Sequence, residues 1–162
     1  MTEKVAVITG SGDGLGKGIA QRLAQDGFRI VLSDINAATL EKTEAEFKSA
    51  GQAVTAFRGD VSRREDQFAL VQHAVQAFGR IDVFVNNAGI EDVMPLDKVT
   101  AADFDRVFGI NVKGVLFGIQ AAAEQMKKQG GDRIYKIINA ASIAAHESYD
   151  LLGIYCASKF SV

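Results

Sequence analysis

The sequence has little of what marks secreted, metal-binding or membrane-spanning proteins. Its one cysteine, Cys156, cannot form an internal disulfide, and we predict no metal site. No apolar run reaches the roughly 18 residues of a membrane span, and the N-terminal residues lack the apolar segment of a signal peptide. We therefore expect a cytoplasmic protein without a membrane partner. Acidic and basic residues are interspersed and the net charge is only −2, which argues against a nucleic-acid partner.

Proline is almost absent as well, with Pro95 the only one, and no linker, low-complexity segment or repeat divides the chain. In a chain of 162 residues, 48% hydrophobic content is enough for one core. We therefore predict a single domain over residues 1–162.

Short apolar runs alternate with amphipathic segments along the chain. The runs predict strands, with helices between them, at residues 5–8, 28–32, 53–57, 81–85 and 134–141. Because every connection is helical, the strands should run parallel, with helices on both faces of the sheet. The predicted fold class is α/β, a Rossmann-like doubly wound parallel sheet with strand order 3-2-1-4-5.

Two capping boxes predict helix starts. Ser62 and Glu65 have this spacing before one helix, and Thr100 and Asp103 have it before a long one. The buried face of the long helix should include Phe104, Val107, Phe108, Val115, Ile119 and Met126.

Asn111 falls in the middle of that apolar face. A buried amide without partners costs a few kcal/mol, so this side chain must be hydrogen-bonded. The spacing leaves two roles open, a structural hydrogen bond or a water held for catalysis.

A glycine-rich turn follows the first strand and precedes a helix. Gly10, Gly14 and Gly16 have no Cβ, so the backbone there can take positive φ and approach a pyrophosphate at the helix N-terminus. The alternative is that the glycines only turn the chain.

An acid, Asp34, ends the second strand about 20 residues after the glycines. It is placed to accept hydrogen bonds from an adenosine ribose and to repel a 2′-phosphate, a repulsion to which Asp13 adds. The alternative role of Asp34 is a helix cap, although Asn36 could serve there.

Tyr155 and Lys159 are four residues apart, so they share one helix face. A free phenol ionises near pKa 10, and an adjacent ammonium favours its phenolate form. Tyr155 is therefore a candidate general acid and base, beside Ser142 at the end of the fifth strand. Such pairs also occur by chance on helix surfaces.

In combination these motifs resemble the short-chain dehydrogenase/reductase family. Thr9-Gly10, Gly14 and Gly16 match its T-G-x-x-x-G-x-G turn, residues 86–89 match N-N-A-G, and its catalytic tetrad is matched in order by Asn111, Ser142, Tyr155 and Lys159. The resemblance implies NAD(P)-dependent hydride transfer, and Asp34 with Asp13 points to NAD.

The resemblance also implies a role for each matched residue. Tyr155 would exchange the proton, Ser142 orient the substrate oxygen, Lys159 assist the phenol and bind ribose, and Asn111 hold a relay water. Cofactor contacts would come from Gly10, Gly12, Asp13, Gly14, Leu15, Gly16, Asp34, Asp60, Val61, Asn87, Ala88, Gly89, Tyr155 and Lys159.

A finer resemblance, in residues 111–122 and 136–145, is to the diacetyl/acetoin reductases, also called 2,3-butanediol dehydrogenases. It implies a small ketone or secondary alcohol as substrate, contacted by Ser142, Ile143, Tyr149 and Tyr155. Alternatives are a 3-oxoacyl or sugar-alcohol reductase, or a non-catalytic nucleotide-binding fragment. The resemblance also implies a homotetramer for the complete protein. Because the family continues well beyond its lysine, we expect this chain to be C-terminally truncated, without the last strands and the substrate lid. On its own it should bind NAD weakly and turn over little or nothing.

Overall fold

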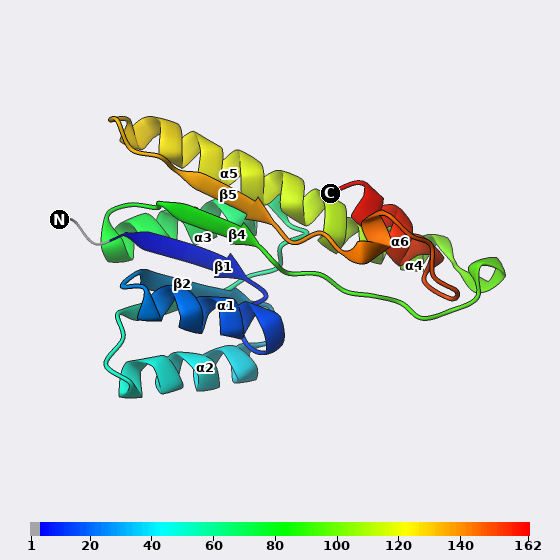
Figure 1. The fold of residues 1–162 in the computed structure, drawn as a ribbon, viewed down its shortest axis with the longest axis horizontal. Coiled ribbons are helices and arrows are strands. Elements are labelled where there is room, and N and C mark those ends of the chain that lie inside the picture. The colour runs from blue at the N-terminus through cyan, green and yellow to red at the C-terminus, as the bar shows by residue number, and fades with distance from the viewer. Residues whose placement is uncertain (1–3) are drawn as a thin grey trace.

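The computed structural model describes residues 4–162 and has one parallel sheet of five strands. The strands are β1 (Val5–Thr9), β2 (Arg29–Asp34), β3 (Val54–Arg58), β4 (Val83–Asn86) and β5 (Lys136–Asn139). Their order in the sheet is β3-β2-β1-β4-β5, and every neighbouring pair is parallel. Figure 1 shows β1, β4 and β5 running in one direction. The predicted fold class and strand order are confirmed.

Two helical layers cover the sheet (Figure 1). On one face lie α1 (Gly14–Gln25) and α2 (Ala37–Ser49), and on the other α3 (Arg64–Phe78) and α5 (Gly114–Gln129). Alternate residues of β1 enter the two cores. Val5 and Val7 pack towards α3 and α5, whereas Ala6 and Ile8 pack with residues of α1 and α2. All five residues of β1 are buried, as a strand covered on both faces requires.

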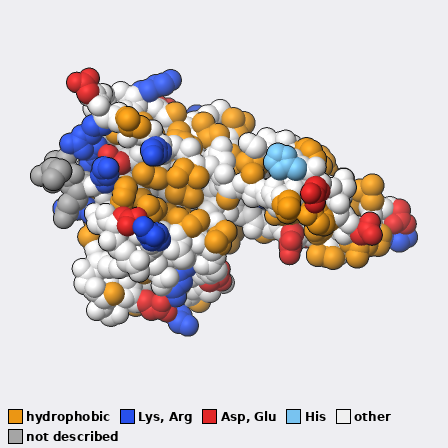
Figure 2. Space-filling model, viewed as in Figure 1, with side chains coloured by type: hydrophobic (Ala, Val, Ile, Leu, Met, Phe, Trp, Pro, Cys, Tyr) orange, Lys and Arg blue, Asp and Glu red, His pale blue; other side chains and the backbone are white. Residues whose placement is uncertain are grey.

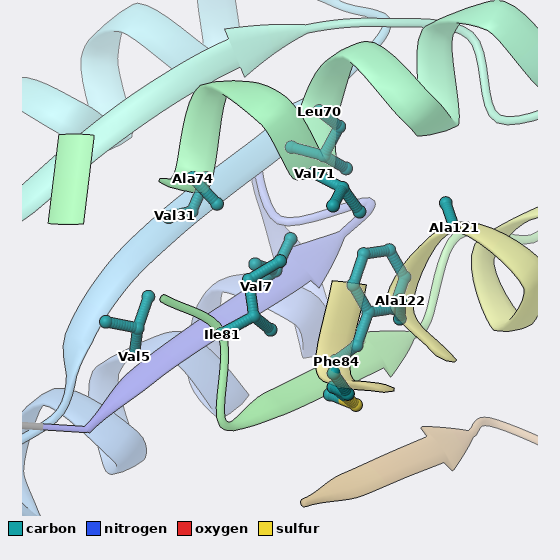
Figure 3. Packing of buried hydrophobic residues seen from close by; sticks show 11 residues of the cluster. Val5, Val7, Val31, Leu70, Val71, Ala74, Ile81, Phe84, Ala121 and Ala122 are labelled. Atoms are coloured by element: carbon teal, nitrogen blue, oxygen red, sulfur yellow. The ribbon is translucent and has the colours of Figure 1, made fainter. Parts of the chain in front are cut away.

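Figure 3 shows the core on the α3–α5 side, where Val7 and Phe84 project from the sheet towards the two helices. Leu70 and Val71 of α3 and Ala121 of α5 complete this contact. Phe84 is fully buried, so its ring contributes its full area to the packing of β4.

The long helix expected after Thr100 is interrupted. It consists of α4 (Ala101–Phe108), a π-helical turn η2 (Gly109–Lys113) and α5. The capping box at Thr100 is confirmed, since its hydroxyl accepts from the Asp103 amide at 3.2 Å and Asp103 Oδ2 accepts from the Thr100 amide at 3.1 Å. The prediction for Phe104 is wrong: its ring is 43% exposed and stacks on Phe108 instead of entering the core.

The other predicted capping box does not form. Helix α3 begins at Arg64, without a side-chain cap. The amide and hydroxyl of Ser62 donate instead to Asp60 Oδ1, at 2.9 and 2.7 Å, so a local turn holds the side chain expected to cap the helix.

The fifth strand is shorter than predicted. Pairing with β4 begins at Lys136, and Ile134, predicted to lie in the strand, is 85% exposed. Ile138 of β5 is also 48% exposed, and Figure 2 shows apolar side chains gathered over β4 and β5 on this face.

The remaining elements are the short 3-10 turns η1 (Leu96–Lys98) and η3 (Ile143–Ala145) and the helix α6 (Gly153–Phe160). Together with α4 they extend beyond the carboxyl end of the sheet in Figure 1. Among the described residues, no helix is long and apolar enough to cross a membrane.

Candidate active site

The glycine turn after β1 is held against the end of β4. Gly10 has a φ of 62°, and a Cβ there would stand 2.8 Å from the Cα of Ala88, so only glycine fits. Asn87 Nδ2 donates to the carbonyl oxygens of Thr9 and Gly10, at 3.0 Å each. These bonds bring residues 87–89 to the same cleft as the turn.

The first turn of α1 offers free backbone donors. Within residues 4–162, the amides of Gly14, Leu15 and Gly16 have no hydrogen-bond acceptor, and Asp13 at the N-cap makes no side-chain cap bond. Free amides at the positive end of a helix favour phosphate oxygens. The turn therefore fits a pyrophosphate.

The carboxylate of Asp34 is held beside the glycine turn by two backbone amides. Its Oδ2 accepts from the Gly12 amide and its Oδ1 from the Asn36 amide, each at 3.0 Å. Asn36 is the N-cap of α2, accepting from the amides of Ala38 and Thr39, so the alternative role considered for Asp34 belongs to Asn36. A carboxylate has about four acceptor positions, so Asp34 can still accept from a ribose.

The loop after β3 forms another wall of the cleft, through Asp60 and Val61. It packs on the helix that follows η2, because a Cβ at Gly114 would stand only 3.0 Å from Val61 Cγ2. A glycine in that helix thus lets the loop approach it closely.

Asn111 lies in η2 and is 1% exposed. Its Oδ1 accepts from the amide of Ile90 at 2.9 Å, and its Nδ2 donates to the Ile90 carbonyl at 2.8 Å and to Ser158 Oγ at 2.9 Å. The amide therefore has structural partners, which hold the segment after β4 and the helix α6 together. Its unused hydrogen-bonding capacity is one lone pair of Oδ1.

Helix α6 directs Tyr155 and Lys159 to the cleft. Lys159 is 6% exposed, and its Nζ donates to the carbonyl of Ala140 at 2.7 Å and lies 5.8 Å from the centroid of the Tyr155 ring. Burial lowers the pKa of the Lys159 ammonium below its ordinary value. The geometry therefore places a cation beside the phenol.

The cleft has a volume of about 550 Å³. The predicted site residues that line it on the glycine-turn side are Gly10, Asp13, Leu15, Gly16 and Asp34. On the other sides they are Asp60, Val61, Asn87, Ala88, Gly89, Tyr155 and Lys159. Residues that end β2 or follow β1, β3 and β4 thus meet residues of α6 at the carboxyl end of the sheet, where open parallel sheets bind ligands.

Other predicted residues do not line this cleft: Gly12, Gly14, Asn111, Ser142, Ile143 and Tyr149. The oxygen of Ser142 caps η3, accepting from the Ala144 amide at 3.2 Å, and Ile143 is 63% exposed. Tyr149 donates to Glu147 at 3.1 Å, and partial burial with that carboxylate raises the pKa of the Tyr149 phenol.

Sequence reasoning missed several residues that serve the cleft. Ile35, Ile90, Ile110 and Ala140 line it, and the hydroxyl of Ser158 links Asn111 to α6. Ser158 precedes Lys159 directly, but nothing in its spacing identifies a partner 47 residues away.

A parallel sheet of this order, with a glycine turn after its first strand, defines the Rossmann class of dinucleotide-binding folds. The sequence profile of the family described as short chain dehydrogenase matches residues 4–162. The chain belongs to the short-chain dehydrogenase family.

Curated relatives include a diacetyl reductase [(S)-acetoin forming] of Staphylococcus epidermidis, 57% identical over 159 residues, with 98% of this chain and 61% of the relative covered. An L-2,3-butanediol dehydrogenase of Corynebacterium glutamicum is 38% identical over 161 residues, with 98% and 62% covered. The chain thus spans less than two thirds of these relatives.

Among solved structures, this chain is similar to a short chain dehydrogenase/reductase of Burkholderia phymatum in complex with NAD. The TM-score is 0.94 at 38% identity, and the match covers 98% of this chain and 56% of that one.

Proposed function

We propose that this protein is an NAD(H)-dependent oxidoreductase that interconverts a small ketone and a secondary alcohol, with diacetyl, acetoin and 2,3-butanediol as its substrates. The observation that carries the proposal is that Tyr155 and Lys159 line the same cleft as the glycine turn and Asp34. The names of the relatives support the choice of substrates.

The cofactor-binding residues are those predicted from the sequence. The free amides after Asp13 would bind the pyrophosphate, Asp34 the adenosine ribose, and Asp60 with Val61 the adenine. Asp34 and Asp13 favour NAD, since a 2′-phosphate would meet two negative charges. NADH supplies the hydride for reduction when it is bound.

We assign the transfer of the proton to and from the substrate oxygen to Tyr155. Its phenol would donate to the substrate oxygen during reduction, and the Lys159 cation beside it would favour the phenolate that remains. Lys159 would also bind the nicotinamide ribose. Ser142 would orient the substrate oxygen, and Ile143 and Tyr149 would contact the rest of the substrate.

Asn111 is proposed to serve the proton relay through Oδ1, the atom with a free lone pair, while its other bonds hold Ile90 and Ser158. A water held there would connect to solvent.

The test follows NADH oxidation by the purified protein with diacetyl and with acetoin, beside 3-oxoacyl and sugar-ketone substrates. We expect turnover with diacetyl and acetoin by the natural gene product, and little or none by residues 1–162 alone. Turnover only with another substrate class would contradict the substrate assignment, and NADH binding without turnover of any substrate would favour a nucleotide-binding module. The same assays with NADPH test the preference assigned to Asp34.

We also propose that the protein is cytoplasmic and forms homotetramers. The single cysteine is consistent with a reducing compartment, and the helices after Thr100 and Gly153 are the expected subunit contacts. Size-exclusion chromatography with light scattering tests the oligomeric state, which a monomer would contradict.

A further inference from the structure

Gly12 is held by residues outside the glycine turn through the two peptide groups that it joins. Its amide donates to Asp34 Oδ2 at 3.0 Å, and its carbonyl accepts from the hydroxyl of Thr43 at 2.6 Å. Asp34 ends β2, whereas Thr43 lies in the middle of α2. The turn is therefore anchored to an element that contributes nothing else to the cleft.

Thr43 lies on the buried face of α2. It is 1% exposed and follows Leu40 by three residues and precedes Phe47 by four, so the three side chains share the face that packs on the sheet. A buried hydroxyl needs a partner, and a helical threonine often uses the carbonyl four residues earlier. Here the Thr43 hydroxyl donates instead to the Gly12 carbonyl, 31 residues away in sequence.

This bond sets the orientation of the next peptide. Because the peptide group is planar and trans, a Gly12 carbonyl that points to Thr43 directs the Asp13 amide away from α2. The free amides of Gly14, Leu15 and Gly16 follow directly. A residue larger than glycine does not fit at position 12, since a Cβ there would stand 2.6 Å from Thr39 Oγ1.

We propose that Thr43 is a positioning residue for the dinucleotide: its hydroxyl fixes the Gly12–Asp13 peptide, so that the amides of the turn are presented to the pyrophosphate before the cofactor binds. Thr43 itself does not line the cleft. This inference rests on the proposed function, because it needs a dinucleotide in that cleft.

The test compares Thr43→Val, which keeps the side-chain shape and removes the donor, with Thr43→Ser, which keeps the donor. Leu40→Val is the matched control, because it weakens the same buried face of α2 without touching the turn. For each variant, fluorescence titration gives the Kd for NADH and for ADP-ribose, steady-state kinetics give kcat and KM, and thermal unfolding gives Tm.

We expect Thr43→Val to raise the Kd for NADH and for ADP-ribose by about 5- to 10-fold, the factor of one lost hydrogen bond. The KM for NADH should rise with it, while kcat at saturating NADH stays within about two-fold, because the chemistry at Tyr155 is not changed. Thr43→Ser should bind NADH nearly as the wild type does.

Two results would overturn the inference. One is an unchanged Kd for NADH in Thr43→Val. The other is that Leu40→Val, at the same loss of Tm, raises the Kd for NADH as much as Thr43→Val does. Failure of the proposed function looks different, since it would appear in the wild type, as a lack of NADH binding or of turnover. Binding of NADH and ADP-ribose without turnover leaves the positioning role measurable by the titrations alone.

Discussion

The centre and the edge of the sheet differ in how firmly the structure holds the residues that follow their strands. Strand β1, in the middle, is buried throughout and delivers a turn whose peptides bond to β4, β2 and α2. Strand β5, at the edge of the described sheet, has alternating exposed and half-buried residues and leads to Ser142 and Ile143, which lie outside the cleft. The proposed cofactor residues are thus held by the core, and the proposed substrate residues by a few local contacts.

β1 and β5 differ in this way because β1 has a neighbouring strand on each side, whereas β5 has only one. A central parallel strand is paired on both edges and covered on both faces, so a shift of any of its residues disturbs two cores. β5 pairs with β4 alone, and Ile138 is half exposed. The following predictions test whether this contrast governs function, beginning with the largest expected effect.

Tyr155→Phe should lower kcat by about 10²- to 10⁴-fold, the usual contribution of a general acid or base. The Kd for NADH should change little, since the variant keeps the ring and all the other proposed cofactor contacts. Tyr135→Phe is the control, because that phenol bonds to the Gly130 carbonyl at the other end of β5. Steady-state kinetics and NADH titration measure both. Full turnover in Tyr155→Phe would remove Tyr155 from the chemistry.

Gly16→Ala should abolish tight NADH binding and lower the free energy of unfolding by about 3 kcal/mol. A Cβ at Gly16 would stand only 2.0 Å from the Gly10 carbonyl oxygen, so the turn must move. At Gly18, two residues along α1, a Cβ meets nothing within 4 Å, so Gly18→Ala should stabilise the helix by about 0.5 to 1 kcal/mol. Chemical denaturation and NADH titration of both variants check this, and equal behaviour of the pair would contradict it.

Asp82→Asn should lower the free energy of unfolding by about 2 kcal/mol at neutral pH, since charge-assisted hydrogen bonds contribute about that much. Asp82 is 5% exposed and accepts from the Val5 amide at 2.9 Å and from Arg80 Nε at 2.8 Å. Burial raises the pKa of Asp82, but the Arg80 hydrogen bonds, the Val5 amide and the Arg80 charge lower it by more, so the net pKa lies below its ordinary value.

Because the pKa of Asp82 is lowered, its contribution to the free energy of unfolding depends on pH in a defined direction. A carboxyl whose pKa is lower when folded stabilises the protein above its unfolded pKa and loses this contribution as pH falls through the folded value. Acid denaturation curves should therefore be less steep for Asp82→Asn than for the wild type. Asp82 is at the amino end of the strands, opposite the cleft, so NADH affinity should not change. A changed affinity would mean that this end of the sheet influences the cleft at the carboxyl end.

Ser158→Ala should have the smallest effect, about 1 kcal/mol of unfolding free energy and a few-fold loss of kcat. The Ser158 hydroxyl donates to the Tyr155 carbonyl at 2.7 Å and accepts from Asn111, so its loss loosens α6 without touching the glycine turn. The Kd for NADH should stay within error of wild type in titrations. A weakened NADH affinity would mean that the two regions are coupled through Asn111.

Most of the sheet could be predicted from the sequence, because β1, β2 and β4 are short apolar runs between recognisable helices, and their order follows from parallel connections. The Thr100 cap was also predictable, since it depends on a residue three positions away, and so was the glycine turn, since its glycines stand between an apolar strand and a helix. The start of α3 was not, because Ser62 has a competing acceptor in Asp60.

The unpredicted parts of the candidate site depend on contacts distant in sequence. The hydroxyls of Thr43 and Ser158 and the amide of Asn111 bond to partners brought near by the fold. Thr43 nevertheless carried a signal, since its spacing from Leu40 and Phe47 puts a polar side chain on a buried face. Sequence reasoning identified the comparable position of Asn111 in this way, and could have identified Thr43.

The π-helical turn η2 has a geometric consequence for the whole carboxyl edge. One extra residue in a helical turn rotates everything beyond it by roughly 100°, the angle that one residue occupies in an α-helix. The α4 segment can then face α6, while α5, on the same continuous helix, faces α3 and β4. Deleting one residue from 109–113 would restore a uniform helix and leave one of these two neighbours without its contact.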